Sequence, residues 1–150
     1  MVTDCGACGC GTITPVLDES LIGHWTDRDL YPHDPEYSEL VFRADGTGWT
    51  YWCSWSTAFT VERFRWRQAA PGVVEVRLVA QLSGTWSTVD GQTRHEVQDR
   101  QTLDTTLSRT YRTTGDPLAL ELDGPIETTL GGTRFTLVSR EAVDPVPAYR

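Results

Sequence analysis

The sequence predicts one all-β domain, an antiparallel up-and-down β-barrel of eight to nine strands, and three observations lead to that prediction. Apolar and polar residues alternate with a period of two along most of the chain, as in strands that bury one face. Gly, Pro and Asp interrupt the alternation at short, regular intervals, which is typical of all-β sandwiches and barrels. No segment shows the periodicity of an amphipathic helix.

Each expected strand shows the alternation and ends at a turn. The short connections favour closure into a meander over a jelly roll, which needs longer crossing connections. A barrel of about eight strands leaves room inside for one small ligand. The expected strands lie at residues 21–25, 39–44, 49–55, 63–68, 74–82, 103–111, 118–122 and 135–139, and the turns at 45–48, 71–72, 90–91, 115–117, 123–125 and 131–132.

Three parts of the chain differ in composition. Residues 1–20 contain a Cys- and Gly-rich stretch that predicts a flexible tail, because it suits neither a helix nor a strand. Residues 21–141 carry the strand pattern and form the expected barrel domain. Residues 142–150 contain two prolines, Pro145 and Pro147, and are expected to form an irregular C-terminal tail.

The segment Leu21-Ile22-Gly23-His24-Trp25, followed by the strand and Asp-Gly turn of residues 40–48, resembles small bacterial lipocalin-like (calycin) domains. The resemblance implies that Trp25 packs across the closed end of the barrel beneath an arginine from a late strand, either Arg134 or Arg140. It also implies small-molecule binding, without naming the molecule. Two features depart from the family: no helix is expected after the last strand, and residues 26–37 read as a loop rather than a helical lid.

Charge and composition limit the classes of partner and of chemistry that the chain can have. The formal net charge of −8 disfavours nucleic acid and anionic membranes. No apolar stretch reaches the roughly 18 residues of a membrane span, and the N-terminus lacks the pattern of a signal peptide, so a cytoplasmic location is expected. All 13 basic residues are Arg, which suggests a GC-rich bacterial genome and excludes a lysine Schiff base. No cofactor is expected, and a homodimer is left open.

Aromatic residues on neighbouring strands are the candidates for a binding site. Large rings with polar edges are suited to line a cavity for a flat, apolar molecule, although they are equally suited to fill the core. Trp52 points to the opposite face and is expected to be either exposed, as part of a partner or dimer surface, or packed under the tail. The expected ligand-binding residues are Trp49, Tyr51, Cys53, Trp55, Phe64, Trp66, Arg109 and Tyr111.

Arg109 is the candidate for an anion-binding group. It alternates with inward-facing leucines, and an inward arginine is costly unless it is paired. It is expected to receive a ligand carboxylate or enolate, to pair with Glu62 or another carboxylate, or to lie beyond the end of the barrel. If the chain catalyses a reaction, the groups to test as electrophile or general acid and base are Arg109, Tyr111, His95 and Tyr51.

Histidines and cysteines are the remaining candidate ligands. His24 points away from Trp25, and no sequence pattern places two histidines on one face for a metal. Cys5, Cys8 and Cys10 are weak candidates for a metal site, with Cys53 as a fourth thiolate, because structural zinc sites use two separated CxxC pairs. The main expectation is a reduced tail that binds no metal. Capture of zinc or copper is the second alternative, and a redox pair is the third.

Three functions follow from these observations. The first is intracellular binding of a small, largely apolar molecule, aromatic or polyene, inside the barrel. The second is a cofactor-free enzyme of the cyclase or isomerase type that acts on a natural-product intermediate in the same cavity. The third is a protein-interaction or immunity-type module with a filled barrel. A continuous interior cavity would favour the first two over the third.

Overall fold

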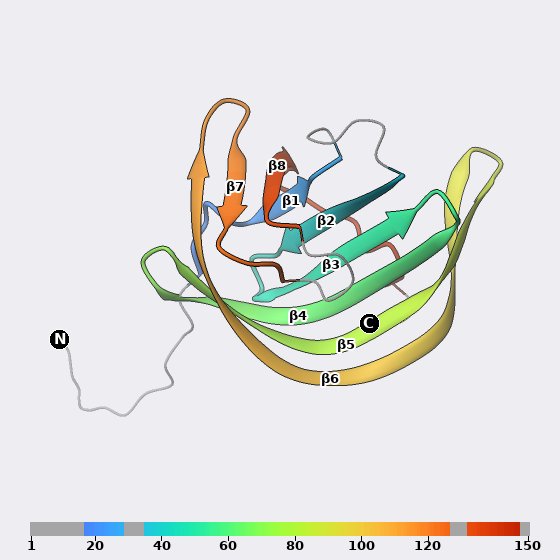
Figure 1. Cartoon of the computed structure of the whole chain (residues 1–150), viewed down its shortest axis with the longest axis horizontal. Coiled ribbons are helices and arrows are strands. Elements are labelled where there is room, and N and C mark those ends of the chain that lie inside the picture. Colours follow the sequence, from blue (N-terminus) through green and yellow to red (C-terminus); the bar gives the residue numbers. More distant parts are fainter. Residues whose placement is uncertain (1–16, 29–34, 127–131, 148–150) are drawn as a thin grey trace.

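The computed structural model describes residues 17–28, 35–126 and 132–147 (Figure 1). Eight strands and no α-helix are present in these ranges. The fifth and sixth strands are longer than the expected ranges of 74–82 and 103–111. The strands are β1 (Gly23–Thr26), β2 (Glu36–Phe42), β3 (Thr47–Ser54), β4 (Ala58–Ala70), β5 (Val73–Val89), β6 (Gln92–Thr114), β7 (Ala119–Leu122) and β8 (Arg134–Ser139).

The strands form a closed ring in sequence order. Each strand pairs antiparallel with the next, and β8 pairs with β1. The predicted all-β, antiparallel meander is therefore confirmed, with eight strands in the described ranges. Figure 1 shows that β4, β5 and β6 form a deep curved trough, while β1, β2, β7 and β8 lie above it. No helix in the described residues is both long and apolar enough to cross a membrane.

The sheet buries side chains on both of its faces. Phe42, Gly48 and Phe64 form one cross-strand row, and Val41, Trp49 and Arg63 form the next row. Because successive residues of a strand point to opposite faces, these rows lie on opposite sides of the sheet. Both rows are buried, apart from a partly exposed Arg63.

Two hydrophobic cores result from this arrangement. The inner core lies inside the ring, since six of the eight strands contribute to it, and the outer core lies on the other face of β2, β3 and β4. The inner core contains Leu21, Trp25, Leu40, Phe42, Phe64, Trp66, Val74, Val76, Leu78, Leu120, Leu122, Ile126 and Phe135. The outer core contains Val41, Trp49, Tyr51, Cys53, Phe59, Val61, Leu82 and Val146.

The expectation that the aromatic residues of β3 and β4 line one binding site was wrong. Trp49, Tyr51 and Cys53 belong to the outer core, whereas Phe64 and Trp66 belong to the inner core. The register across the β3–β4 turn pairs odd residues with odd residues, so the even-numbered aromatics of β4 face the other way. A register that differed by one residue would have placed the two groups together.

Two further expectations about the aromatic face and β5 were also wrong. Trp55 is 66% exposed, because β3 ends at Ser54 and Trp55 lies in the turn that follows. The predicted apolar face of β5 changes sides, because the pairing with β4 shifts at Val79 and sends Leu82 to the outer core. Trp52 is half-buried on the inner side of β3, so it is not an exposed partner surface.

The first strand, β1, is anchored by Trp25, and an arginine from the end of the chain lies over the Trp25 ring. Trp25 is fully buried in the inner core, and its indole Nε1 donates a hydrogen bond to the Leu21 carbonyl at 2.9 Å. The Arg140 guanidinium lies 6.0 Å from the centre of the Trp25 ring and also donates to the Ser20 carbonyl. Of the two arginines considered, Arg140 therefore occupies this position, and Arg134 lies beside Glu121 instead.

Candidate functional site

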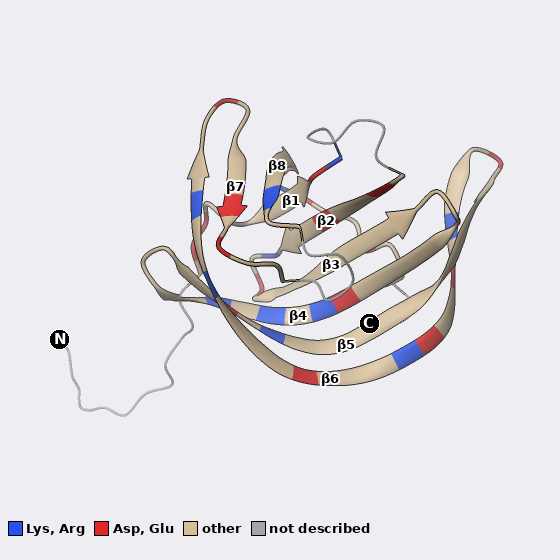
Figure 2. Cartoon of the chain, in the orientation of Figure 1, with Lys and Arg blue, Asp and Glu red and all other residues tan. Residues whose placement is uncertain are grey.

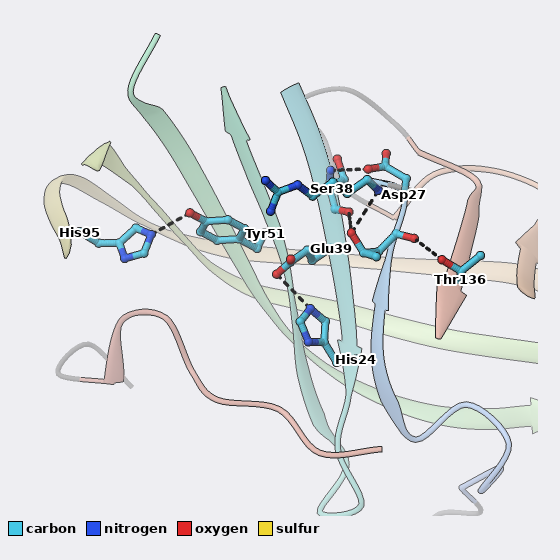
Figure 3. Close-up of polar contacts among 9 residues, drawn as sticks. His24, Asp27, Ser38, Glu39, Tyr51, His95 and Thr136 are labelled. Atoms are coloured by element: carbon cyan, nitrogen blue, oxygen red, sulfur yellow. Dashed lines mark hydrogen bonds and ion pairs between the residues drawn. The ribbon is translucent and has the colours of Figure 1, made fainter. Parts of the chain in front are cut away.

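A cleft of about 200 Å³ opens on the outer face of the sheet. Its floor is formed by β1, β2 and β3, one wall by the distal part of β6, and its roof by the segment after β8 (Figure 3). The cleft thus lies outside the ring rather than in the interior that the sequence suggested. The residues that line it are His24, Tyr37, Glu39, Val41, Trp49, Tyr51, Thr93, His95, Ala142, Val143 and Pro145.

Tyr51 and His95 form the polar centre of the cleft. The Tyr51 hydroxyl lies 2.7 Å from His95 Nε2, and the two rings meet edge to face with their centres 5.5 Å apart (Figure 3). Phe59 packs edge to face against the same imidazole at 4.8 Å. The hydrogen bond joins β3 to the distal half of β6, although the two residues are 44 positions apart in sequence.

Burial keeps both members of this pair uncharged. Burial raises the pKa of Tyr51 far above its usual value, and the neighbouring Cys53 adds to the effect. Burial lowers the pKa of His95 below its usual value of 6.5. At neutral pH the cleft therefore holds a phenol and a neutral imidazole in hydrogen-bond contact, and both groups can donate or accept hydrogen bonds without carrying a charge.

His24 and Glu39 form a second polar pair on the floor of the cleft. His24 Nε2 lies 3.0 Å from Glu39 Oε1, and each side chain is 24% exposed (Figure 3). The alternation that buries Trp25 in the inner core turns His24 to the outer face. Tyr37, from the same face of β2, stands beside Tyr51 with the ring centres 6.4 Å apart.

A hydrogen-bond network fixes the floor of the cleft at the end of β1. The Ser38 amide donates to Asp27 Oδ1 at 2.7 Å, and the Thr26 hydroxyl is directed at the Ser38 carbonyl at 3.5 Å. The Thr136 hydroxyl donates to the Thr26 carbonyl and links the network to β8 (Figure 3). Because β1 has only four residues, these bonds hold it, and hence His24, against β2.

The roof is attached to β4 by an ion pair. Arg63 Nη1 and Nη2 lie 2.8 and 3.1 Å from the two carboxylate oxygens of Asp144, and Nη2 also donates to the Val146 carbonyl at 2.9 Å. The Arg63 and Asp144 side chains are only 12% and 4% exposed. A two-pronged contact of this kind fixes orientation as well as distance. It places Ala142, Val143 and Pro145 over the cleft.

Of the four sequence-based candidates for chemistry, the structure brings Tyr51 and His95 together and places the other two elsewhere. Arg109 faces the inner side of β6, and its guanidinium donates to the Pro125 carbonyl at 2.9 Å and to the Ser108 carbonyl. Its hydrogen-bond partners are backbone carbonyls, so pairing with Glu62, one of the three alternatives considered for Arg109, was wrong. Glu62 accepts a hydrogen bond from Gln81 instead.

Tyr111 also lies on the inner side, away from the cleft. Its hydroxyl donates to Asp18 Oδ2 and accepts from Gln68 Nε2. Burial raises the pKa of Tyr111 well above its usual value, and the Asp18 carboxylate raises it further. Tyr111 therefore serves as a hydrogen-bonding link between β6, β4 and the residues before β1.

The cysteines divide between the outer core and the region that is not described. Cys53 is a free, buried thiol beneath Tyr37 and Tyr51, and burial raises its pKa. Cys5, Cys8 and Cys10 lie outside the described residues. Among the residues that the structure does describe, no three or more His, Cys, Asp or Glu side chains are grouped so as to hold a metal ion.

Sequence reasoning missed His24, Glu39, Tyr37 and the residues of the roof as site residues. The alternation did place His24 opposite Trp25, and it gives the same face of β2 to Tyr37 and Glu39. What the sequence lacked was a reason to treat that face as buried. The segment that covers it is fixed by a contact between residues 81 positions apart.

Comparisons with protein-family models, with curated proteins and with solved structures found no match to this chain, so its function is inferred from the cleft alone.

Proposed function

We propose that the cleft on the outer face binds one small, flat, largely apolar molecule with a hydrogen-bonding edge. The observation that carries this proposal is the convergence of Tyr51, His95, His24 and Glu39 on one cleft whose floor includes an aromatic side chain, Trp49. A pocket with apolar walls and a few converging polar groups is the usual form of a small-molecule site.

The size of the cleft limits the ligand. Drug-sized molecules occupy pockets of roughly 300 to 1,000 Å³, whereas a cavity of about 150 Å³ holds a single benzene ring. A cleft of about 200 Å³ therefore suits one ring or two fused rings. A polyene is too long for this site, so the proposed ligand class is narrower than the sequence suggested.

The polar groups define how such a ligand would be held. A phenol or an indole can stack on Trp49 and direct its O–H or N–H toward the imidazole of His95 or the carboxylate of Glu39. Tyr51 stays protonated because burial raises its pKa, and its hydroxyl can donate to a ligand when His95 Nε2–H is the donor in the bond between the two residues. Each such neutral hydrogen bond contributes about 1 kcal/mol net, so affinity depends on both stacking and polar contact.

The test uses 2-naphthol, indole and naphthalene as probes, with the imidazole resonances of His24 and His95 as the readout. We expect 2-naphthol to shift the signals of His24 and His95, which line the cleft. Tyr51→Phe should weaken binding about threefold to tenfold, the loss expected for one net hydrogen bond. Naphthalene should bind more weakly than 2-naphthol, because it has no polar edge.

Tyr111→Phe is the matched control, since it removes a hydroxyl from the inner side of the ring. It should leave the affinity for 2-naphthol unchanged. The proposal fails if none of the three probes shifts His24 or His95 at millimolar concentration. It also fails if Tyr51→Phe and Tyr111→Phe weaken binding equally.

A further inference from the structure

Glu39 and Tyr51 lie directly opposite each other on the floor of the cleft. The register of β2 and β3 pairs these two residues, and both side chains line the cleft. Because the Cβ atoms of directly opposite residues lie about 4.5 to 5.5 Å apart, a carboxylate and a phenol stand side by side. Figure 3 shows them next to each other, with His24 beside the carboxylate and His95 beside the phenol.

The carboxylate of Glu39 has one oxygen held and the other open to a ligand. Figure 2 shows that β3 bears no charged residue and that the charges of β2 are acidic. Of the described residues that line the cleft, Glu39 alone has a carboxylate. His24 Nε2 contacts Glu39 Oε1, whereas Oε2 has no hydrogen bond or ion pair to any residue that the structure describes. Oε2 can therefore accept a proton from a ligand in the cleft.

The hydroxyl of Tyr51 can donate to the same ligand. It lies 2.7 Å from His95 Nε2, and when His95 carries its hydrogen on Nε2, the imidazole is the donor and the phenolic hydrogen is left for the ligand. Burial is the main cause that raises the pKa of Tyr51 far above its usual value, and the charge of Glu39 adds to it. The phenol therefore keeps its hydrogen beside the carboxylate, and the two groups remain a donor and an acceptor.

We propose that the cleft catalyses proton transfer at the carbon next to the carbonyl group of a small ring ketone, with Glu39 as the base and Tyr51 as the donor to the carbonyl oxygen. This inference rests on the proposed function, because the ketone must occupy the same cleft. In such a ketone, only the carbonyl carbon and the α-carbon separate the oxygen from the α-hydrogen. One molecule can therefore contact both side chains at once, as a base and an electrophile require.

The step uses only the ketone and these two side chains. Glu39 Oε2 takes the α-hydrogen as a proton, the C–H electron pair forms a carbon–carbon double bond, and the carbonyl π pair moves to the oxygen to give an enolate. Tyr51 donates a hydrogen bond to that oxygen, where the negative charge develops. Return of the proton from Glu39 to the carbon restores the ketone. In D2O the proton on Glu39 exchanges with solvent before it returns, so the C–H bond becomes C–D.

The size of the cleft selects the ketone for the test. A cleft of about 200 Å³ suits two fused rings, and 2-tetralone is a ketone of that size. 2-Naphthol has the same ring skeleton and carries its oxygen on the same carbon, so it resembles the enol of 2-tetralone. An enzyme binds the species that resembles its transition state more tightly than the substrate. We therefore expect 2-naphthol to bind more tightly than 2-tetralone and to inhibit the reaction.

Exchange of the C1 hydrogens of 2-tetralone in D2O, followed by proton NMR, provides the readout. The wild type should exchange them at least about 100-fold faster than buffer alone, since a positioned base contributes roughly that much or more. Glu39→Gln keeps the size of the side chain but removes the base, so exchange should fall to the buffer rate while the affinity for 2-naphthol changes less than about threefold. Tyr51→Phe should slow exchange at saturating ketone by more than about tenfold, a larger loss than its loss of 2-naphthol affinity.

Tyr111→Phe is again the control and should leave exchange unchanged, because its hydroxyl lies on the inner side of the ring. If 2-naphthol binds but the wild type exchanges 2-tetralone no faster than buffer, this inference is wrong and the proposed function stands. If neither compound binds, both are wrong. Undiminished exchange in Glu39→Gln would overturn the assigned base. Nitrogen-15 shifts that place the His95 hydrogen on Nδ1 with 2-tetralone bound would overturn the assigned donor.

Discussion

At the scale of single residues, the pair of Tyr51 and His95 joins two distant strands through two buried, neutral groups. Its hydrogen bond links β3 to the far end of the β5–β6 hairpin, and its burial holds both groups neutral. Burial disfavours the protonated imidazole, so His95 is most stable in this position while it is neutral. The stability of this contact is therefore linked to pH.

His95→Gln tests that link. Because the pKa of His95 is lower in the folded chain than its usual 6.5, the unfolded chain binds the proton more readily. The contribution of His95 to the free energy of unfolding is therefore intact above about pH 7 and declines as the pH falls through 6.5. Urea unfolding at pH 8, 7, 6 and 5 should show a shallower decline for His95→Gln than for the wild type. Parallel curves would contradict the prediction.

At the scale of elements, the segment after β8 owes its position to one contact. The apolar side chains of Ala142 and Val146 pack on the outer core, but the Arg63–Asp144 pair fixes their register on β4. Removing one member of a buried pair leaves the other charge without compensation, which costs about 3 to 5 kcal/mol. The roof of the cleft and the stability of the fold should therefore depend on the same carboxylate.

Asp144→Ala should lower the free energy of unfolding by about 3 kcal/mol and also weaken 2-naphthol binding, because the roof is released. Asp104→Ala is the matched control: it breaks an Arg–Asp pair at 3.2 Å whose side chains are 59% and 78% exposed. An exposed pair contributes at most about 1 kcal/mol. Denaturant titration at one dilute chain concentration compares the two, and equal losses would refute the assigned role of Asp144.

At the scale of the whole molecule, the ring is one sheet with a core on each face. β4 and β5 contribute to both cores, since Phe64 and Leu78 face inward while Phe59 and Leu82 face outward. Loss of packing in one core therefore disturbs β4 and β5, which also contribute side chains to the other core. We therefore expect the molecule to unfold as one cooperative unit.

Phe59→Ala and Phe64→Ala test this expectation, because each removes a ring that is 1% exposed from a different core. Each should cost about 3 to 5 kcal/mol. Both should lower the midpoint of one shared transition, seen at the same temperature by circular dichroism and by tryptophan fluorescence. Two separate transitions in either variant would show that the cores are independent.

Alternation and turn residues in the sequence by themselves determined the fold class, the antiparallel order of the strands and, outside β5 and the end of β3, which residues of a strand share a face. They did so because both signals are local: a strand has a period of two, and Gly or Asp permits the turn. The sequence also showed that His24 and Trp25 point to opposite sides. Tyr51 and His95 were recognised as polar groups, but not as partners.

Only the tertiary structure decided how these faces combine. The register across the β3–β4 turn assigned Trp49 and Phe64 to different cores, and the shift at Val79 moved Leu82 from one core to the other. Register and shift depend on pairing between strands, so one strand's pattern cannot reveal them. The cleft depends on the Arg63–Asp144 contact across 81 positions, and this long-range contact covers a face that the sequence pattern did not show to be buried.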